Sequence, residues 1–76
     1  MDYRAVNYLN ECIELCNKLL SYYQQNIEKQ RECTDGELLA QLNIGEEESR
    51  KSVQRLKNRL INLRNKELQR IESNNL

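Results

Sequence analysis

The sequence predicts an all-α fold, in which two long helices form an antiparallel hairpin with a short connecting helix between them. Proline is missing from the 76 residues and glycine occurs twice, so little interrupts regular structure. Two long stretches repeat apolar residues at helical spacing, and the charged and turn-forming stretch ECTDGE, residues 32–37, separates them. Together these observations indicate two rods joined by a compact link.

The first long helix is expected at residues 3–31. At about 100° per residue, one group of apolar side chains falls within an arc of about 120° and forms a core face. This group comprises Leu9, Cys12, Ile13, Cys16, Leu19, Leu20, Tyr23 and Ile27. Tyr8, Leu15 and Tyr22 follow one another at intervals of seven residues beside that arc. The apolar surface is therefore wider than one neighbouring helix needs.

A short helix is expected at residues 35–42. Thr34 and Glu37 have the spacing of a capping box, which satisfies backbone donors at the start of a helix. Leu38, Leu39 and Leu42 are expected to face inward. Asn43 or Gly45 can adopt the left-handed conformation that ends helices, so a break is expected there.

The last long helix is expected at residues 46–73. Its apolar side chains share an arc of about 160° at helical spacing; they are Val53, Leu56, Leu60, Ile61, Leu63, Leu68 and Ile71. Basic side chains form a narrow stripe opposite this arc, namely Arg55, Arg59, Lys66 and Arg70. This stripe is the expected charged contact face of the protein.

Two amphipathic rods of similar length, about 40 Å each, make a thin core. Pairing two hairpins into a four-helix bundle is a common way for a short chain to bury enough surface. The additional apolar strip on the first helix therefore predicts a homodimer. Tyr8, Leu15, Leu19 and Tyr22 are the expected dimer or partner interface.

No catalytic, cofactor-binding or metal-binding set is recognisable. The chain has no histidine, which is the commonest general base at neutral pH and the commonest metal ligand. Cys12, Cys16 and Cys33 are one ligand short of a structural zinc site, and we interpret Cys12 and Cys16 as buried free thiols. The sequence therefore does not predict an enzyme.

The protein is expected to be cytoplasmic. No stretch approaches the roughly 20 apolar residues that span a bilayer, so no membrane segment is expected. The first residues lack the basic start and apolar core of a signal peptide. Three cysteines, an odd number, fit free thiols in a reducing compartment.

A nucleic-acid-binding regulator is the alternative interpretation, because residues 37–64 resemble a helix-turn-helix in outline. That motif presents the first turns of its second helix to DNA, and here those turns carry Glu46, Glu47 and Glu48. Three carboxylates would be repelled by phosphate. The hairpin layout is also similar to that of the Rop-like bundles, some of which bind RNA, but the similarity is one of fold.

The leading functional expectation is a small helical protein–protein interaction module that acts as a regulator, adaptor or chaperone. Twelve basic and twelve acidic residues balance, so net charge does not favour nucleic acid or membrane as a partner. A helical module presents an apolar helix face with a charged rim to a partner protein. The sequence does not identify that partner.

Overall fold

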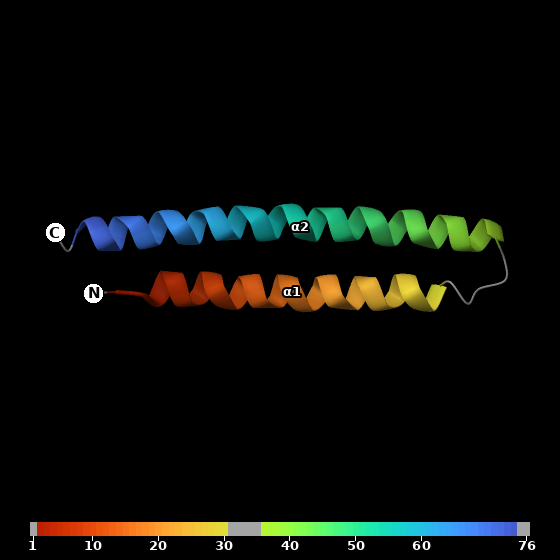
Figure 1. The fold of residues 1–76 in the computed structure, drawn as a ribbon, viewed down its shortest axis with the longest axis horizontal. Helices are drawn as coiled ribbons and strands as arrows, with labels where there is room; N and C mark the ends of the chain where they lie inside the picture. The colour runs from red at the N-terminus through yellow and green to blue at the C-terminus, as the bar shows by residue number, and fades with distance from the viewer. Residues whose placement is uncertain (1, 31–35, 75–76) are drawn as a thin grey trace.

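The computed structural model describes residues 2–30 and 36–74, and both stretches are dominated by a single helix. Helix α1 spans Arg4–Gln30 and helix α2 spans Gly36–Ser73. The two helices lie side by side and antiparallel, with both ends of the chain at the same end of the hairpin (Figure 1). The described residues contain no strand. The expected helical hairpin is therefore correct.

The expected short connecting helix is wrong. Helix α2 is continuous from Gly36 to Ser73, through the Asn43–Gly45 stretch where we expected a break. Among the described residues no glycine has a positive φ, so Gly45 has an ordinary helical backbone and does not end a helix. Its cost of about 1 kcal/mol relative to alanine is small beside the hydrogen bonds of an unbroken helix. Thr34 of the expected capping box lies outside the described residues.

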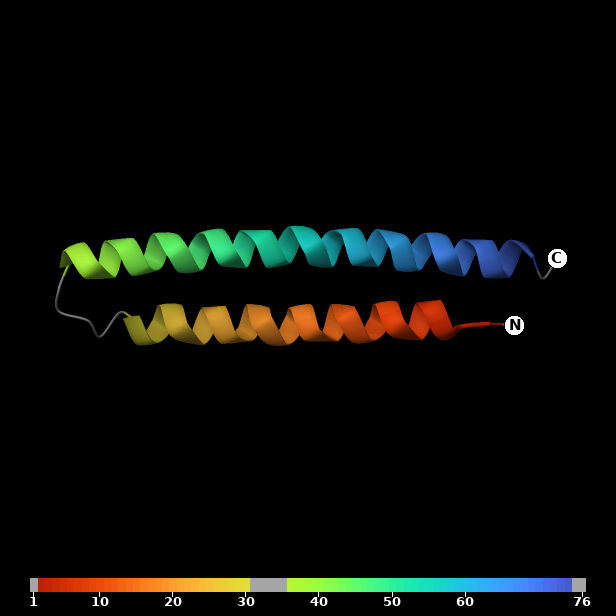
Figure 2. The same cartoon turned by 180° about the vertical axis from the view of Figure 1, so that it is seen from behind.

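The continuous helix makes the two rods unequal. At 1.5 Å per residue the 27 residues of α1 extend about 40 Å, as expected, whereas the 38 residues of α2 extend about 57 Å. The whole hairpin measures 61 × 14 × 11 Å. Figure 2, from behind, shows α2 extending beyond α1 where the chain turns.

The side of α1 that meets α2 follows a seven-residue repeat. One row of its buried and half-buried residues is spaced alternately three and four apart, which is the spacing of antiparallel coiled-coil packing. They are Val6, Leu9, Ile13, Cys16, Leu20, Tyr23 and Ile27. The equivalent residues of α2 follow the same rule: Leu39, Asn43, Glu46, Arg50, Val53, Lys57, Leu60, Arg64, Glu67 and Ile71. We call these two sets the inner seam.

The inner seam is apolar on α1 and largely polar on α2. Only Val6, Ile13, Cys16 and Ile71 are buried among the described residues, and none of them is completely enclosed. Within the described residues, four buried side-chain atoms of this region have no hydrogen-bond partner in the protein: Gln30 Oε1, Asn43 Oδ1, Glu46 Oε2 and Arg64 Nε. Long side chains such as Arg50 and Lys57 cover α1 with their aliphatic stems. The core of the hairpin is consequently thin.

The continuity of α2 can be tested by placing proline at its two glycines. Gly45→Pro is expected to lower the free energy of unfolding by about 3 kcal/mol or more, because proline removes a helical hydrogen bond and its ring clashes with the preceding turn. Chemical denaturation followed by circular dichroism would measure this loss.

Gly36→Pro is the matched control for this experiment. Gly36 is the first residue of α2, where proline is accepted because its missing N–H has no helical partner. The control is expected to retain nearly all of the stability. Equal stability of the two proline variants would contradict an unbroken α2.

Candidate functional site: the open face of the hairpin

Large apolar side chains gather on one side of the hairpin. The structure leaves ten of them exposed among its described residues, and eight of these lie one position before a residue of the inner seam. On α1 the eight include Tyr8, Leu15, Leu19 and Tyr22; on α2 they include Leu38, Leu42, Leu56 and Leu63. Tyr3 and Ile44 are the two that lie elsewhere. The exposed apolar surface is thus concentrated on one side of the hairpin.

The two apolar rows belong to the same face of the hairpin. A residue that precedes the inner seam by one position is turned about 100° away from it. Because α1 and α2 are right-handed and run in opposite directions, this turn brings both rows to the same side of the pair. We call this surface the open face. It consists of Ala5, Tyr8, Cys12, Leu15, Leu19, Tyr22 and Asn26 on α1, and Leu38, Leu42, Gly45, Ser49, Ser52, Leu56, Arg59, Leu63, Lys66 and Arg70 on α2.

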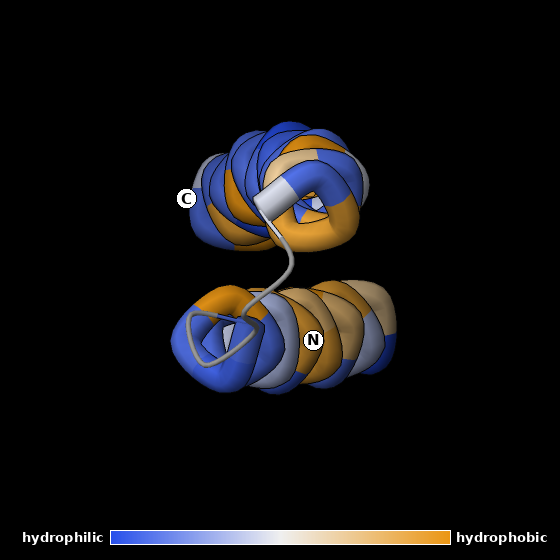
Figure 3. The backbone as a smooth tube through the Cα atoms, turned by 90° about the vertical axis from the view of Figure 1, so that its right-hand side faces the viewer, coloured by the Kyte–Doolittle hydropathy of each residue, from blue (hydrophilic) through white to orange (hydrophobic). Residues whose placement is uncertain are grey.

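The opposite face of α1 is entirely polar. The residues that follow the inner seam by one position are Asn7, Asn10, Glu14, Asn17, Ser21, Gln24 and Glu28. Seen along its length, the tube of α1 is orange toward α2 and blue over much of its outer surface (Figure 3). The same side of α2 is mixed, because Ile44, Ile61 and Leu68 follow its inner seam by one position, so the contrast between a polar face and an apolar face belongs to α1. Such contiguous apolar patches on a small protein mark interaction surfaces.

The expected interface residues of α1 all lie on the open face. The exposed fractions of Tyr8, Leu15 and Tyr22 are 66%, 57% and 58%, and that of Leu19 is 45%. Leu19 was expected both in the core arc and at the interface, and in the hairpin it is exposed. Cys12 is half-buried between these side chains and carries a free thiol, as does the buried Cys16. Cys33 lies outside the described residues.

One hydrogen bond fixes how the rows are aligned. Arg64 Nη1 donates to Asn10 Oδ1 at 3.1 Å and links α2 to α1. Because both helices rise equally per residue, Tyr8 lies within about one turn of Leu63 and Lys66. By the same reasoning Leu15 lies within about one turn of Leu56 and Arg59. The tertiary structure thus places the tyrosine row beside part of the basic stripe.

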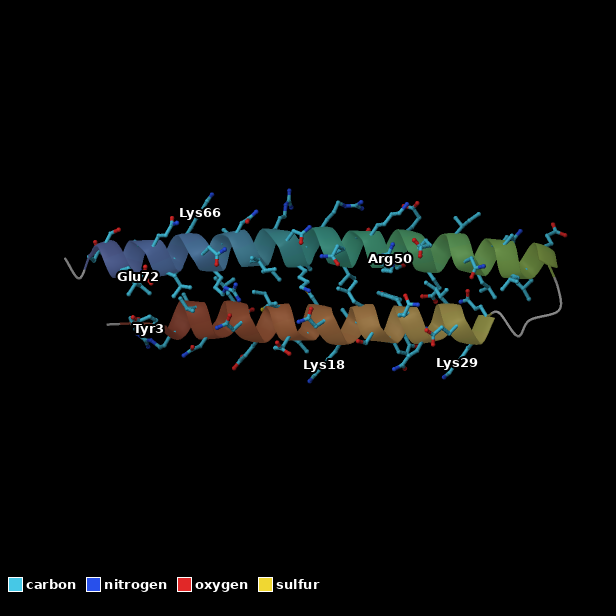
Figure 4. The ribbon with its side chains drawn as sticks, viewed as in Figure 1. Tyr3, Lys18, Lys29, Arg50, Lys66 and Glu72 are labelled. Atoms are coloured by element: carbon cyan, nitrogen blue, oxygen red, sulfur yellow. The ribbon has the colours of Figure 1, made fainter. Side chains whose placement is uncertain are left out.

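The basic stripe is divided between two surfaces. Arg59, Lys66 and Arg70 lie on the open face, whereas Arg55 is turned toward the outer side of α2. Lys66 points away from α1, as do Lys18 and Lys29 from α2 (Figure 4). Two shallow hollows follow this edge; Ser52, Arg55, Leu56 and Arg59 line one, and Arg59, Asn62, Leu63 and Lys66 line the other. Both hollows combine leucine with arginine or lysine.

Neighbouring acids partly neutralise the cations of α2. Arg70 forms an ion pair with Glu67, and Arg50 forms one with Glu47 at 3.0 Å. Hydrogen bonds from these guanidinium groups lower the pKa of Glu67 and of Glu47 below the ordinary value of 4.5. Arg55 donates to Ser52 Oγ. Within the stripe the ion pair with Glu67 neutralises Arg70, so this end of the stripe is a weaker phosphate-binding surface than its sequence suggests.

Four leucines of the open face were assigned wrongly from the sequence. Leu38 and Leu42 were expected to face inward, and Leu56 and Leu63 were placed in the core arc, but all four are exposed. The α2 residues that do face α1 include Asn43, Arg50 and Lys57. Because these residues are polar, a sequence analysis that looks for apolar side chains does not identify them as part of the contact between the helices. The seven-residue repeat of α1, combined with equal spacing on α2, is the signal that would have identified them.

The outline of a helix-turn-helix is not found in residues 37–64. Helix α2 passes through them without a turn, so no second helix is set at an angle to enter a groove. Among the described residues no group of three or more histidine, cysteine, aspartate or glutamate side chains is arranged to hold a metal ion. No helix within residues 2–30 and 36–74 is both long and apolar enough to cross a membrane.

The chain was compared with protein families, with curated proteins and with solved structures, and none of these matches it. The features of the chain that bear on its function are therefore the open face and the packing beneath it.

The ion pairs of α2 make a prediction for the pH dependence of stability. Because the pKa of Glu47 and of Glu67 is lower in the folded protein, the pairs stabilise it above a pH of about 4.5, and this contribution disappears as the pH falls through the lowered pKa. Thermal melts from neutral to acidic pH should show a fall in Tm over that window.

The double variant Glu47→Gln, Glu67→Gln tests the assignment of this effect. Glutamine does not titrate, so the variant should show a smaller fall of Tm over the same pH range. Parallel curves for the variant and the native chain would show that other carboxylates cause the acid sensitivity.

Proposed function

We propose that this protein is a helical protein–protein interaction module without catalytic activity, whose open face binds the apolar side of other helices. The observation that carries the proposal is the gathering of eight exposed large apolar side chains on one face of the hairpin. A small regulator, adaptor or chaperone that acts by binding a partner needs such a surface and no catalytic site. The polar face of α1 keeps the free hairpin hydrated.

The chemistry of the open face suits a helix better than a small molecule or a nucleic acid. Helices dock through apolar residues at positions i, i+3, i+4 and i+7, and the spacing of Tyr8, Cys12, Leu15, Leu19 and Tyr22 matches that rule. Tyrosine contributes large apolar area with a polar tip, which suits a surface that alternates between water and a partner. Arg59 and Lys66 supply a positive rim that favours partners with acidic edges.

The thiols favour a reducing compartment for this function. Cys12 lies between the tyrosines and leucines of the open face, where it acts as a small apolar group while it remains reduced. Oxidation would make this position polar and weaken association. We therefore propose that the protein works in the cytoplasm.

Site-specific photo-cross-linking in the cells that make the protein tests the proposed function. A photoreactive amino acid is introduced at Leu19 or Leu63 on the open face, and at Lys51 on the opposite face as the matched control. We expect cross-linked adducts several-fold more abundant from Leu19 and Leu63 than from Lys51, because only the open face would be in contact with another helix. Equal yields from the two faces, or none from either, would contradict the proposal.

Low-salt gel shifts with duplex DNA and with RNA measure the competing function. A nucleic-acid-binding surface on Arg55, Arg59 and Lys66 would give a shift that weakens steeply with salt. A salt-sensitive shift that is lost in an Arg59→Gln, Lys66→Gln variant would replace the proposed function. We expect no such shift, since Arg59 and Lys66 alternate with Leu56 and Leu63 on the open face and do not form a continuous basic surface.

A further inference from the structure

We propose that the open face binds a second copy of this chain, in the opposite direction, about a two-fold axis that crosses α2 between Ser52 and Leu56. The result is an antiparallel four-helix bundle in which α1 packs on α1 and α2 on α2 of the other copy. This inference rests on the proposed function, because it takes the open face as the binding surface. It adds the identity of the partner and its direction.

The solvent-exposed area of the hairpin exceeds that of a compact protein by about the area that a second hairpin would cover. A compact protein of 9.1 kDa exposes about 4,900 Å² by the scaling of surface with mass. The hairpin exposes 5932 Å², which is about 1,000 Å² more than that. A standard interface buries about 800 Å² on each partner. One further hairpin laid on the open face would therefore remove the excess.

The sizes of the open-face residues on α2 are complementary about the proposed axis. Leucines and long basic residues fill the half after the axis, whereas glycine and serines fill the middle of the half before it. In antiparallel packing Leu56 meets Ser52 of the other copy, Arg59 meets Ser49, and Leu63 meets Gly45. These three central layers each pair a large side chain with a small one, the arrangement that fills a helix interface without voids, while toward the ends of the interface Lys66 meets Leu42 and Arg70 meets Leu38.

Helix α1 obeys the same symmetry. Its open-face row repeats every seven residues and has its centre near Leu15 and Leu19. Reversing the direction of a second copy brings Leu15 opposite Leu19 and Cys12 opposite Tyr22. In the alignment given by the Asn10–Arg64 hydrogen bond, the centre of the α1 row at residue 17 lies beside residue 57 of α2, about 4.5 Å along the bundle from the axis on α2.

The charges of α2 favour the antiparallel direction. Residues 36–49 carry four acids and no base, whereas residues 50–70 carry eight bases and one acid. Reversal lays the basic part of each α2 along the acidic part of the other, although the four acids lie outside the open-face row itself. Copies that ran in the same direction would place both basic parts at one end of the bundle, where they repel each other. Direction therefore follows from the distribution of charge along one helix.

The mass of the native chain and a single substitution at Gly45 test the dimer. We expect sedimentation to give twice 9.1 kDa at micromolar concentration. In the single hairpin a Cβ atom added at Gly45 meets nothing within 4 Å, and leucine favours the helix. Gly45→Leu should nevertheless weaken the dimer at least about tenfold, because Leu63 of the other copy occupies that space. An unchanged or tighter dimer would overturn the proposed packing.

Disulfide trapping tests the direction. In a chain whose three cysteines are changed to alanine, single variants Leu63→Cys and Gly45→Cys carry tags of different mass and are mixed and oxidised. We expect a disulfide between them, since the antiparallel bundle brings these positions within the roughly 7 Å that a disulfide requires. Leu63→Cys alone should not link to itself, because its copies lie about 27 Å apart along the bundle. Lys51→Cys on the opposite face is the control.

The outcomes separate this inference from the proposed function. A link between Leu63→Cys and Tyr8→Cys, without one to Gly45→Cys, would overturn the antiparallel direction. A native chain that stays at 9.1 kDa overturns the inference, and the function survives if Leu63 is then photo-cross-linked to another protein. A monomer without such adducts contradicts both. If the cysteine-free chain does not fold, the native mass and the Gly45→Leu measurement decide.

Discussion

The polar character of α2 where it faces α1 is the constraint on which the rest of the structure depends. Six of its ten inner-seam residues are polar or charged: Asn43, Glu46, Arg50, Lys57, Arg64 and Glu67. These side chains cover α1 with aliphatic stems but cannot form the dense apolar interior that stabilises small domains. The apolar residues of α2 are displaced to the neighbouring face as a consequence. The feature that weakens the hairpin is therefore also the feature that creates the open face.

A hairpin of this kind gains from association more than a compact domain does. Short chains bury a small fraction of their surface and commonly need disulfides, metals or oligomerisation to be stable. Here the described cysteines are free thiols, and the described residues hold no metal-binding group. The binding of another helix pair, as we propose, would link stability to the presence of the partner. In the arrangement we propose, folding and recognition share one surface.

Predictions from the sequence were correct where a pattern within one helix decides the structure. They were wrong where the structure depends on how the other helix packs. The apolar repeat of α1 identified the tyrosine and leucine row correctly. On this helix the inner-seam row and the open-face row are both apolar, and each row repeats every seven residues. On α2 the assumption that leucine faces inward failed for Leu56 and Leu63. Helix α1 contacts Arg50, Lys57 and Arg64 instead, a choice that the amphipathic pattern of a single helix does not reveal. The break assigned to Gly45 failed because helix propensity is a weak local preference that the surrounding turns override.

The sequence by itself determined the helical class, the presence of two long helices and the surplus of apolar surface on α1. These properties follow from proline content, capping residues and periodicity, all of which act within a few residues. Only the tertiary structure decided that α2 is unbroken and that its leucine row lies beside the tyrosines of α1. That outcome depends on the alignment fixed by Asn10 and Arg64, which are 54 residues apart in the chain. Contacts across such a separation are set by the packing of both helices together, and neither helix encodes them alone.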